Sequence, residues 1–229
     1  MNKNKKFIEY FPLIDSLRAI SVVAVIIYHL DINFFGHKFF SGGYLGVDIF
    51  FFISGYLITE IIYIEYIKTG KFNLINFYIR RFLRIVPAIL FLSFFLITFS
   101  YFVLLPVDLI QFSKINISNI FFFSNFYFHY NHFFYWADAE FNPLLHTWSL
   151  AIEVQYYLIF SILIYIIINY FYKNLFLIIS SACLITFLLS NYLTLFHSNF
   201  SFYMLPSRIF EFLLGSIIFL KKKKLKNFF

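Results

Sequence analysis

Two residues of the first apolar segment, Arg18 and His29, could take part in acid–base chemistry. They are eleven positions apart, which is close to a whole number of helical turns, so a helix would place both on one face, roughly 16 Å apart along its axis. A histidine there can act as a general base on a hydroxyl group, and Asp15, one turn before Arg18, could pair with the guanidinium. From the residues alone, a structural histidine satisfied by a neighbouring helix is an equally good explanation.

A second group of basic residues could bind an anion. Arg81 and Arg84 are one helical turn apart, and Arg80 adjoins them. Guanidinium groups bind phosphate with two parallel hydrogen bonds, so this spacing is suited to a phosphorylated ligand. Anchoring to anionic lipid headgroups accounts for the same residues, and from the spacing alone it is the better explanation.

Three later segments also place polar or small residues inside apolar sequence. At 42–60 the glycines favour close approach of a neighbouring helix, and at 146–160 polar residues stand at the start of an apolar run. In the last apolar segment, an arginine and a glutamate one turn apart are expected to form an intramembrane ion pair. The candidate residues of these segments are Asp48, Ser54, Gly55, His146, Trp148, Glu153, Arg208 and Glu211.

Neither metal binding nor disulfide formation is expected. His129 and His132 are three positions apart but have no further ligands nearby in the sequence, so no metal site is predicted. The single cysteine, Cys183, has no partner for an internal disulfide.

The elements that must hold these residues are membrane-spanning helices. Of the 229 residues, 62% are hydrophobic and only 13% are charged, whereas soluble domains are nearer to half apolar and a quarter charged. Runs long enough to span a bilayer occur near 13–33, 45–67, 85–105, 144–169, 175–196 and 203–220. The sequence therefore predicts an all-α, polytopic transmembrane bundle of six spans, forming a single domain over 1–229. The aromatic segment 117–136 is interpreted as interfacial or re-entrant, and a seventh crossing there is the alternative.

Basic residues predict the orientation of this bundle. With a cytoplasmic N-terminus, 14 of the 18 lysines and arginines fall in segments on the inner side, as the positive-inside rule requires. Both termini are then cytoplasmic. The same placement explains the net charge of +7 without a nucleic-acid partner.

Five motifs, in order along the chain, resemble the membrane-bound acyltransferase 3 family, the bacterial O-acetyltransferases of surface polysaccharides. They are Arg18 and His29 separated by ten residues, GYLGVDIFFFISGYLI at 43–58, Arg81-x-x-Arg84 followed by Ile85 and Pro87, HTWSLAIE at 146–153, and Arg208, Glu211 and Gly215. Together they cover about 11–220. The chain has Ser16 where the family usually has glycine and Val154 where it usually has a second glutamate.

The resemblance implies an O-acyltransferase of the bacterial inner membrane. It would move an acyl group, acetyl by default, from cytoplasmic acyl-CoA to a hydroxyl of a cell-envelope glycan such as O-antigen, capsule or exopolysaccharide. It implies that His29 is the essential histidine, acting as base or transient acyl carrier, and that Arg18 helps engage the donor. Arg81 and Arg84, with Arg80 beside them, would hold the anionic acyl-CoA.

Two other interpretations remain open at this point. Family members typically have about ten spans, so the chain is expected to be truncated at its C-terminus, and an inactive fragment or a partner subunit is one alternative. A transporter or exporter is the other, because buried charges also occur in transporters. The sequence, however, lacks the inverted repeats that many transporters have.

Overall fold

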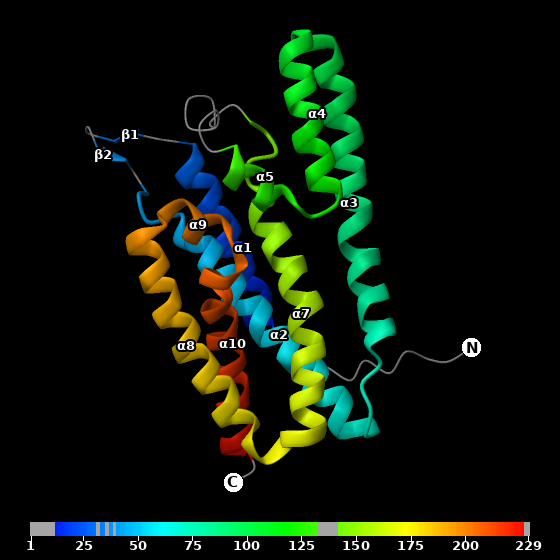
Figure 1. The fold of residues 1–229 in the computed structure, drawn as a ribbon, viewed down its shortest axis with the longest axis vertical. Helices are drawn as coiled ribbons and strands as arrows, with labels where there is room; N and C mark the ends of the chain where they lie inside the picture. The colour runs from blue at the N-terminus through cyan, green and yellow to red at the C-terminus, as the bar shows by residue number, and fades with distance from the viewer. Residues whose placement is uncertain (1–11, 31–32, 35–36, 39, 132–141, 227–229) are drawn as a thin grey trace. The chain divides into compact units, whose positions relative to one another are not determined.

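The computed structural model describes residues 12–30, 33–34, 37–38, 40–131 and 142–226, and nearly all of them are helical (Figure 1). The helices are α1 (Pro12–His29), α2 (Leu45–Thr69), α3 (Leu74–Val103), α4 (Pro106–Ile120), α5 (Ser124–Tyr130), α7 (Thr147–Phe171), α8 (Leu175–Phe196), α9 (Ser198–Tyr203) and α10 (Leu205–Lys226), with the 3-10 turn η2 (Tyr172–Asn174) between α7 and α8. The only extended residues in the described ranges are the two-residue antiparallel strands β1 (Asn33–Phe34) and β2 (His37–Lys38). The predicted all-helical class is confirmed.

Four stretches of the described chain are long and apolar enough to cross a membrane, which makes this a membrane protein. They are Pro12–His29, Leu45–Thr69, Leu74–Val103 and Thr147–Phe196, the last of which contains both α7 and α8. The segment that forms α10 is not among them, because it contains Arg208, Glu211 and a run of lysines. The number of spans and the cytoplasmic position of the termini stay predictions.

Helix α3 begins earlier than the predicted third span. The Asn73 side chain caps its N-terminus by accepting a hydrogen bond from the backbone N–H of Asn76 (2.9 Å). Pro87 lies inside the helix without ending it. With 30 residues, α3 is about 45 Å long, which exceeds the roughly 30 Å of a bilayer's hydrocarbon core.

The described part of segment 117–136 is not a continuous helix. It breaks between α4 and α5, where Phe122 has a φ of 58°, in the left-handed region. The 15 residues of α4 and the 7 of α5 are each fewer than the roughly 20 that a transmembrane helix needs. The interfacial or re-entrant interpretation stays a prediction, because residues 132–136 lie outside the described residues.

The chain divides into two compact units. Unit 1 comprises 1–72, 163–188 and 209–229. Within it, α1 packs on α2 (Figure 1), and α2 packs on α10 through reciprocal glycines. A Cβ atom on Gly55 would overlap the Phe212 carbonyl oxygen, and one on Gly215 would overlap the Phe52 carbonyl oxygen. Beside them the Thr59 hydroxyl donates to Ser216 Oγ (2.8 Å).

These contacts confirm the predicted close approach at most of the glycines of 42–60. Gly43 and Gly46 meet α1 at Ala24 and Ser21, and Gly55 meets α10. Gly42 is different, because a Cβ atom there would have nothing within 4 Å.

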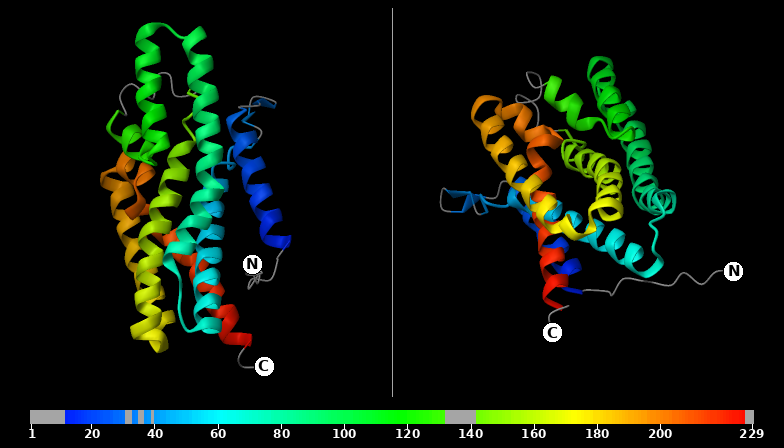
Figure 2. Two further views of the ribbon diagram at one scale, coloured as in Figure 1. Left: turned by 90° about the vertical axis from the view of Figure 1, so that its right-hand side faces the viewer. Right: turned by 60° about the horizontal axis from the view of Figure 1, so that its bottom comes forward.

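Unit 2 comprises 73–162 and 189–208. Helices α3 and α4 run side by side in it as an antiparallel pair (Figure 2). The Asn116 amide donates to the Ser93 carbonyl oxygen (3.1 Å), which ties the pair together. The first part of α7 is held to α3 by Tyr78, whose hydroxyl donates to the Leu158 carbonyl oxygen (3.0 Å) and shares a hydrogen bond with Ser161 (2.7 Å).

Candidate functional site

The predicted acid–base pair lies on one uninterrupted helix, α1, in unit 1. His29 is the last residue of α1, and its Nδ1 donates to the Val25 carbonyl oxygen (2.7 Å). In the neutral imidazole, a proton on Nδ1 makes Nε2 the acceptor nitrogen. The Tyr28 ring meets His29 edge to face with centroids 5.0 Å apart, and Tyr44 meets Tyr28 at 5.8 Å. One ring nitrogen of His29 is thus bound to the helix backbone, and the Tyr28 ring contacts the imidazole.

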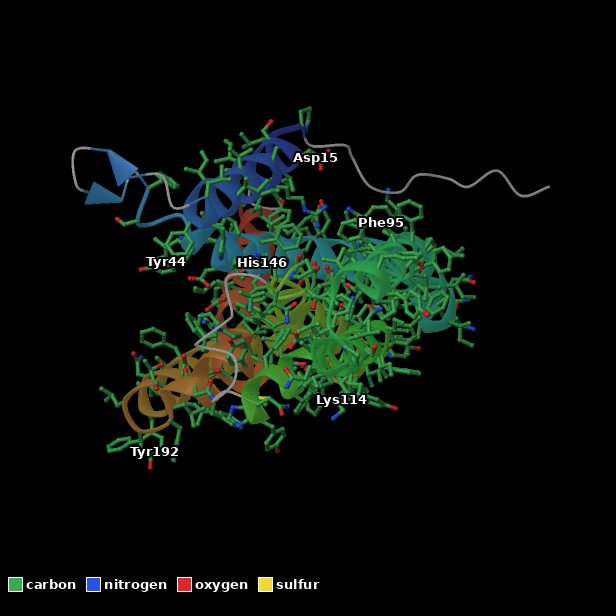
Figure 3. The ribbon with its side chains drawn as sticks, turned by 90° about the horizontal axis from the view of Figure 1, so that it is seen from above. Asp15, Tyr44, Phe95, Lys114, His146 and Tyr192 are labelled. Carbon is green, nitrogen blue, oxygen red and sulfur yellow. The ribbon has the colours of Figure 1, made fainter. Side chains whose placement is uncertain are left out.

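Arg18 is half-buried, and its guanidinium carbon lies 5.5 Å from the centroid of the Phe50 ring of α2. Within the described residues, Arg18 Nε has no hydrogen-bond partner and Arg18 forms no ion pair with Asp15. Asp15 is exposed near one end of α1, and Tyr44 lies near the other end (Figure 3). The predicted Asp15–Arg18 pair is therefore wrong for this structure, because the guanidinium turns to an aromatic face instead.

The two chargeable residues of α1 are little covered by the rest of the protein. His29 is exposed and Arg18 only half-buried. The reason is that α1 contacts α2 through a narrow face, and Ser21 is the one buried residue of this fully described helix. Of the other candidates in unit 1, Asp48 is half-buried in the first turn of α2, whereas Ser54 and Gly55 are buried further along it.

The three arginines of α3, which lie in unit 2, have different surroundings. Arg81 is half-buried, with its guanidinium carbon 5.6 Å from the centroid of the Phe77 ring and 5.3 Å from that of Tyr157. Such distances are typical of cation–π contacts. Arg80 and Arg84 are exposed. The structure therefore fixes one guanidinium between two rings and leaves two on the surface of the same helix.

Glu153 is connected to Arg81 through Tyr157, which contacts both residues. The glutamate is only 4% exposed, and the Tyr157 hydroxyl donates a hydrogen bond to its Oε1. The same tyrosine ring faces Arg81. Tyr157 was not among the predicted residues, although its position four residues after Glu153 on a helix was a usable signal.

An apolar cavity of about 330 Å³ adjoins these residues in unit 2. Among the described residues that line it, Arg81 is the only charged one. Its other walls come from aromatic and aliphatic side chains, which include Tyr78, Phe82, Val86, Phe122, Val154 and Tyr157. Val154 is the position at which the resemblance leads one to expect a glutamate, so the wall is apolar at that point. Sequence periodicity could not have predicted a cavity that α3, α7 and the α4–α5 turn form together.

A hydrogen-bond network fixes the α4–α5 turn beside this cavity. Gln155 Nε2 donates to the Phe122 carbonyl oxygen (3.0 Å) and to Asn125 Oδ1 (2.9 Å). The Asn125 amide in turn donates to the Tyr203 carbonyl oxygen (3.2 Å). A left-handed backbone conformation is unfavourable for phenylalanine by itself. These bonds stabilise the Phe122 backbone in that conformation beside the cavity.

The remaining candidates of unit 2 surround an aromatic cluster. Trp148 is buried, with ring centroids 4.7 Å from Phe202 and 5.6 Å from Tyr203. The Arg208 guanidinium carbon lies 5.4 Å from the Phe202 centroid and 5.9 Å from that of Trp148, and Arg208 Nε donates to the Phe202 carbonyl oxygen (3.4 Å). His146 is exposed. Glu211 is buried in the part of α10 that belongs to unit 1, and its ion pair with Arg208 stays a prediction.

Among the described residues, no three or more His, Cys, Asp or Glu side chains are grouped so that they could hold a metal ion. His129 contacts Asn199 through its carbonyl oxygen (3.1 Å), and His132 lies outside the described residues. Most of the candidate residues therefore fall into three sets, one on α1 and α2, one around Arg81 and Glu153, and one around Trp148 and Arg208.

Comparison with known proteins finds a family model and several relatives that match the chain. Residues 11–229 match a family model described as an acyltransferase domain. The chain is 42% identical over 162 residues to the O-acetyltransferase OatA of Staphylococcus aureus strain NCTC 8325, covering 71% of this chain and 26% of that protein. It is 41% identical over 170 residues to the putative O-acetyltransferase SACOL0978 of S. aureus strain COL, covering 72% and 27%. The chain thus spans about a quarter of the length of these relatives. No solved structure matches it.

Proposed function

Because the chain belongs to the acyltransferase 3 family, we propose that it acts in a bacterial cytoplasmic membrane as an O-acyltransferase, with acetyl-CoA as its cytoplasmic donor and a hydroxyl of a cell-envelope glycan as its acceptor. The match over residues 11–229 carries this proposal. The names of the relatives, both O-acetyltransferases, support the acetyl group and the ester product.

His29 is the base in the proposed reaction. Its Nδ1 is occupied by the bond to the Val25 carbonyl oxygen, so Nε2 can accept the proton of the acceptor hydroxyl. The hydroxyl oxygen forms a bond to the acyl carbon, the bond from that carbon to sulfur breaks, and the released thiolate takes up a proton to become the CoA thiol. Arg18 assists by stabilising negative charge on the donor.

Arg81 and Arg84 bind the phosphate groups of the donor in this proposal. Arg81 is held between two rings, which reduces the side-chain entropy that it loses on binding a ligand. Arg84 and Arg80 are exposed on the same helix and supply further positive charge.

The proposal is tested by measuring base-labile acetate on envelope glycans of cells that produce the protein, together with release of CoA thiol from acetyl-CoA by their membranes. We expect both signals to rise with the amount of protein. Release of CoA thiol without acetate on the glycans would mean that the acceptor is a different molecule. Neither signal, with the protein present in the membrane, would contradict the acyltransferase assignment.

Replacing Arg84 by glutamine is expected to raise the KM for acetyl-CoA about 10- to 100-fold. Hydrogen bonds to charged groups contribute about 1.5–3 kcal/mol, and every 1.4 kcal/mol or so is a factor of ten. Arg84 is exposed, so the change should not disturb packing. Lys173→Gln, which removes an exposed positive charge from η2, is the matched control. An equal KM in both variants would exclude Arg84 from donor binding.

A further inference from the structure

The cavity beside Arg81 lies among membrane-spanning helices of unit 2. Of the described residues that line it, all except Phe122 belong to the two stretches that contain α3 and α7, each long and apolar enough to cross a membrane. Four of these lining residues have large apolar side chains that are exposed, namely Ile79, Phe82, Leu83 and Leu158. Exposed apolar side chains of a spanning helix contact lipid, so an occupant would enter this cavity from the lipid and not from water.

The lining favours a hydrocarbon chain over a polar ligand. Apart from Arg81, the polar side-chain groups of the described lining are the hydroxyls of two tyrosines. Both hydroxyls already donate hydrogen bonds, that of Tyr78 to the Leu158 carbonyl oxygen and that of Tyr157 to Glu153. A ligand rich in amides or hydroxyls would leave its polar groups without partners there, which is unfavourable. Water is disfavoured for the same reason, because apolar cavities stay dry.

The size of the cavity suits one acyl chain. Its volume of about 330 Å³ has room for around ten methylene groups, if each takes up roughly the 30 Å³ of a water molecule in the liquid. A chain that comes from the bilayer is already in an apolar medium, so the hydrophobic effect does not drive it into the protein. The gain is dispersion contact with walls that would otherwise face a void. The fit of the chain to the cavity therefore decides its binding.

Arg81 adds a preference for a lipid that carries phosphate. Its guanidinium contributes to the lining, and guanidinium groups bind phosphate through two parallel hydrogen bonds. Glu153, which accepts a hydrogen bond from Tyr157, is not among the described residues of the lining. A phospholipid whose chain fills the cavity can therefore bring its phosphate to this arginine.

We propose that this cavity binds one acyl chain of a phospholipid of the surrounding membrane, with the phosphate of that lipid at Arg81. The inference goes beyond the proposed function, because no step of acyl transfer uses the apolar lining. The walls are fixed before the lipid binds. Tyr78 holds α7 to α3 through its hydrogen bonds to Leu158 and Ser161, and Gln155 donates to the Phe122 carbonyl oxygen.

The test counts phosphatidylglycerol molecules that stay bound to the purified protein in detergent, by mass spectrometry of the intact protein. Wild-type protein is expected to retain one. Val154→Phe fills the cavity from α7 and Val86→Phe fills it from α3, and each should lower the retained fraction about tenfold, since the ring takes the space of the chain. Two variants keep the test valid if one does not fold. Val103→Phe, on α3 at a position that is 62% exposed and outside the lining, is the control and should retain lipid as the wild type does.

The phosphate contact is tested with Arg81→Gln and with diacylglycerol, which has the chains but no phosphate. The variant is expected to retain phosphatidylglycerol no better than wild-type protein retains diacylglycerol, and equal retention of phosphatidylglycerol by variant and wild type would show that the phosphate is not at Arg81. Glycerophosphoglycerol, the headgroup without chains, should not displace the lipid. If it does so as effectively as phosphatidylglycerol, the protein binds only a phosphate.

Two further results would overturn the inference. They are a wild-type protein that retains no phosphatidylglycerol, and filling variants that retain as much as the wild type. Acetyl transfer is not measured in this experiment, so either result leaves the proposed function standing.

Discussion

Replacing His29 by glutamine is expected to reduce acetyl transfer by about 10² to 10⁴, the usual contribution of a general base. Glutamine is of similar length and polar, but it cannot accept a proton at neutral pH. Because His29 is exposed at the end of α1, its loss should remove little packing. The measurement is base-labile acetate on envelope glycans, normalised to the amount of protein in the membrane fraction.

His197→Gln is a suitable control for this experiment. His197 is also exposed and also borders a helix, at the start of α9, but it belongs to none of the candidate motifs. We expect its acetate signal to equal that of the wild type. Full acetylation in the His29 variant would show that another group removes the proton and that this histidine is structural.

The second large effect is expected for Gly55→Val. A Cβ atom at this position would overlap the Phe212 carbonyl oxygen, which is backbone and cannot turn aside. Gly215 of α10 lies in the same close contact. Helices α2 and α10 would therefore have to move apart. Overpacking typically costs about 1–3 kcal/mol and sometimes more, and we expect the upper end here, from a total stability of about 5–15 kcal/mol. The midpoint of thermal unfolding in detergent, and the yield of monodisperse protein, should both fall.

Gly42→Val is the matched control, because a Cβ atom at Gly42 would meet nothing within 4 Å. The same substitution in the same sequence segment should therefore leave the unfolding midpoint almost unchanged. If the two variants unfold at the same temperature, the contact between α2 and α10 is not as close as described.

Composition and local patterns were sufficient to predict much of the fold. Apolar runs of spanning length predicted helices at the positions of α1, α2, α7 and α8, because a chain in lipid must satisfy its backbone hydrogen bonds within each segment. The glycines at 43, 46 and 55 correctly predicted close helix contacts. The start of α3 was not predicted, because it depends on a local cap at Asn73 rather than on hydropathy.

The surroundings of the candidate residues were harder to predict. Spacing placed Arg18 and His29 on one helix, but the exposure of His29 depends on how little of α1 another helix covers. The neighbours of Arg81 show the same difficulty, since Tyr157 is far from it in the sequence and meets it only through folding. Periodicity describes one helix at a time, whereas a site is made by several.

The length of α3 has a consequence for the lipid around the protein. After Arg84 the helix contains no charged residue up to Val103, and those 19 residues measure about 29 Å, close to the thickness of the hydrocarbon core. The arginines would then lie at the level of the lipid phosphates, where anionic headgroups and a soluble donor compete for the same guanidinium groups. Apparent donor affinity should therefore depend on membrane composition and fall as the proportion of anionic lipid rises.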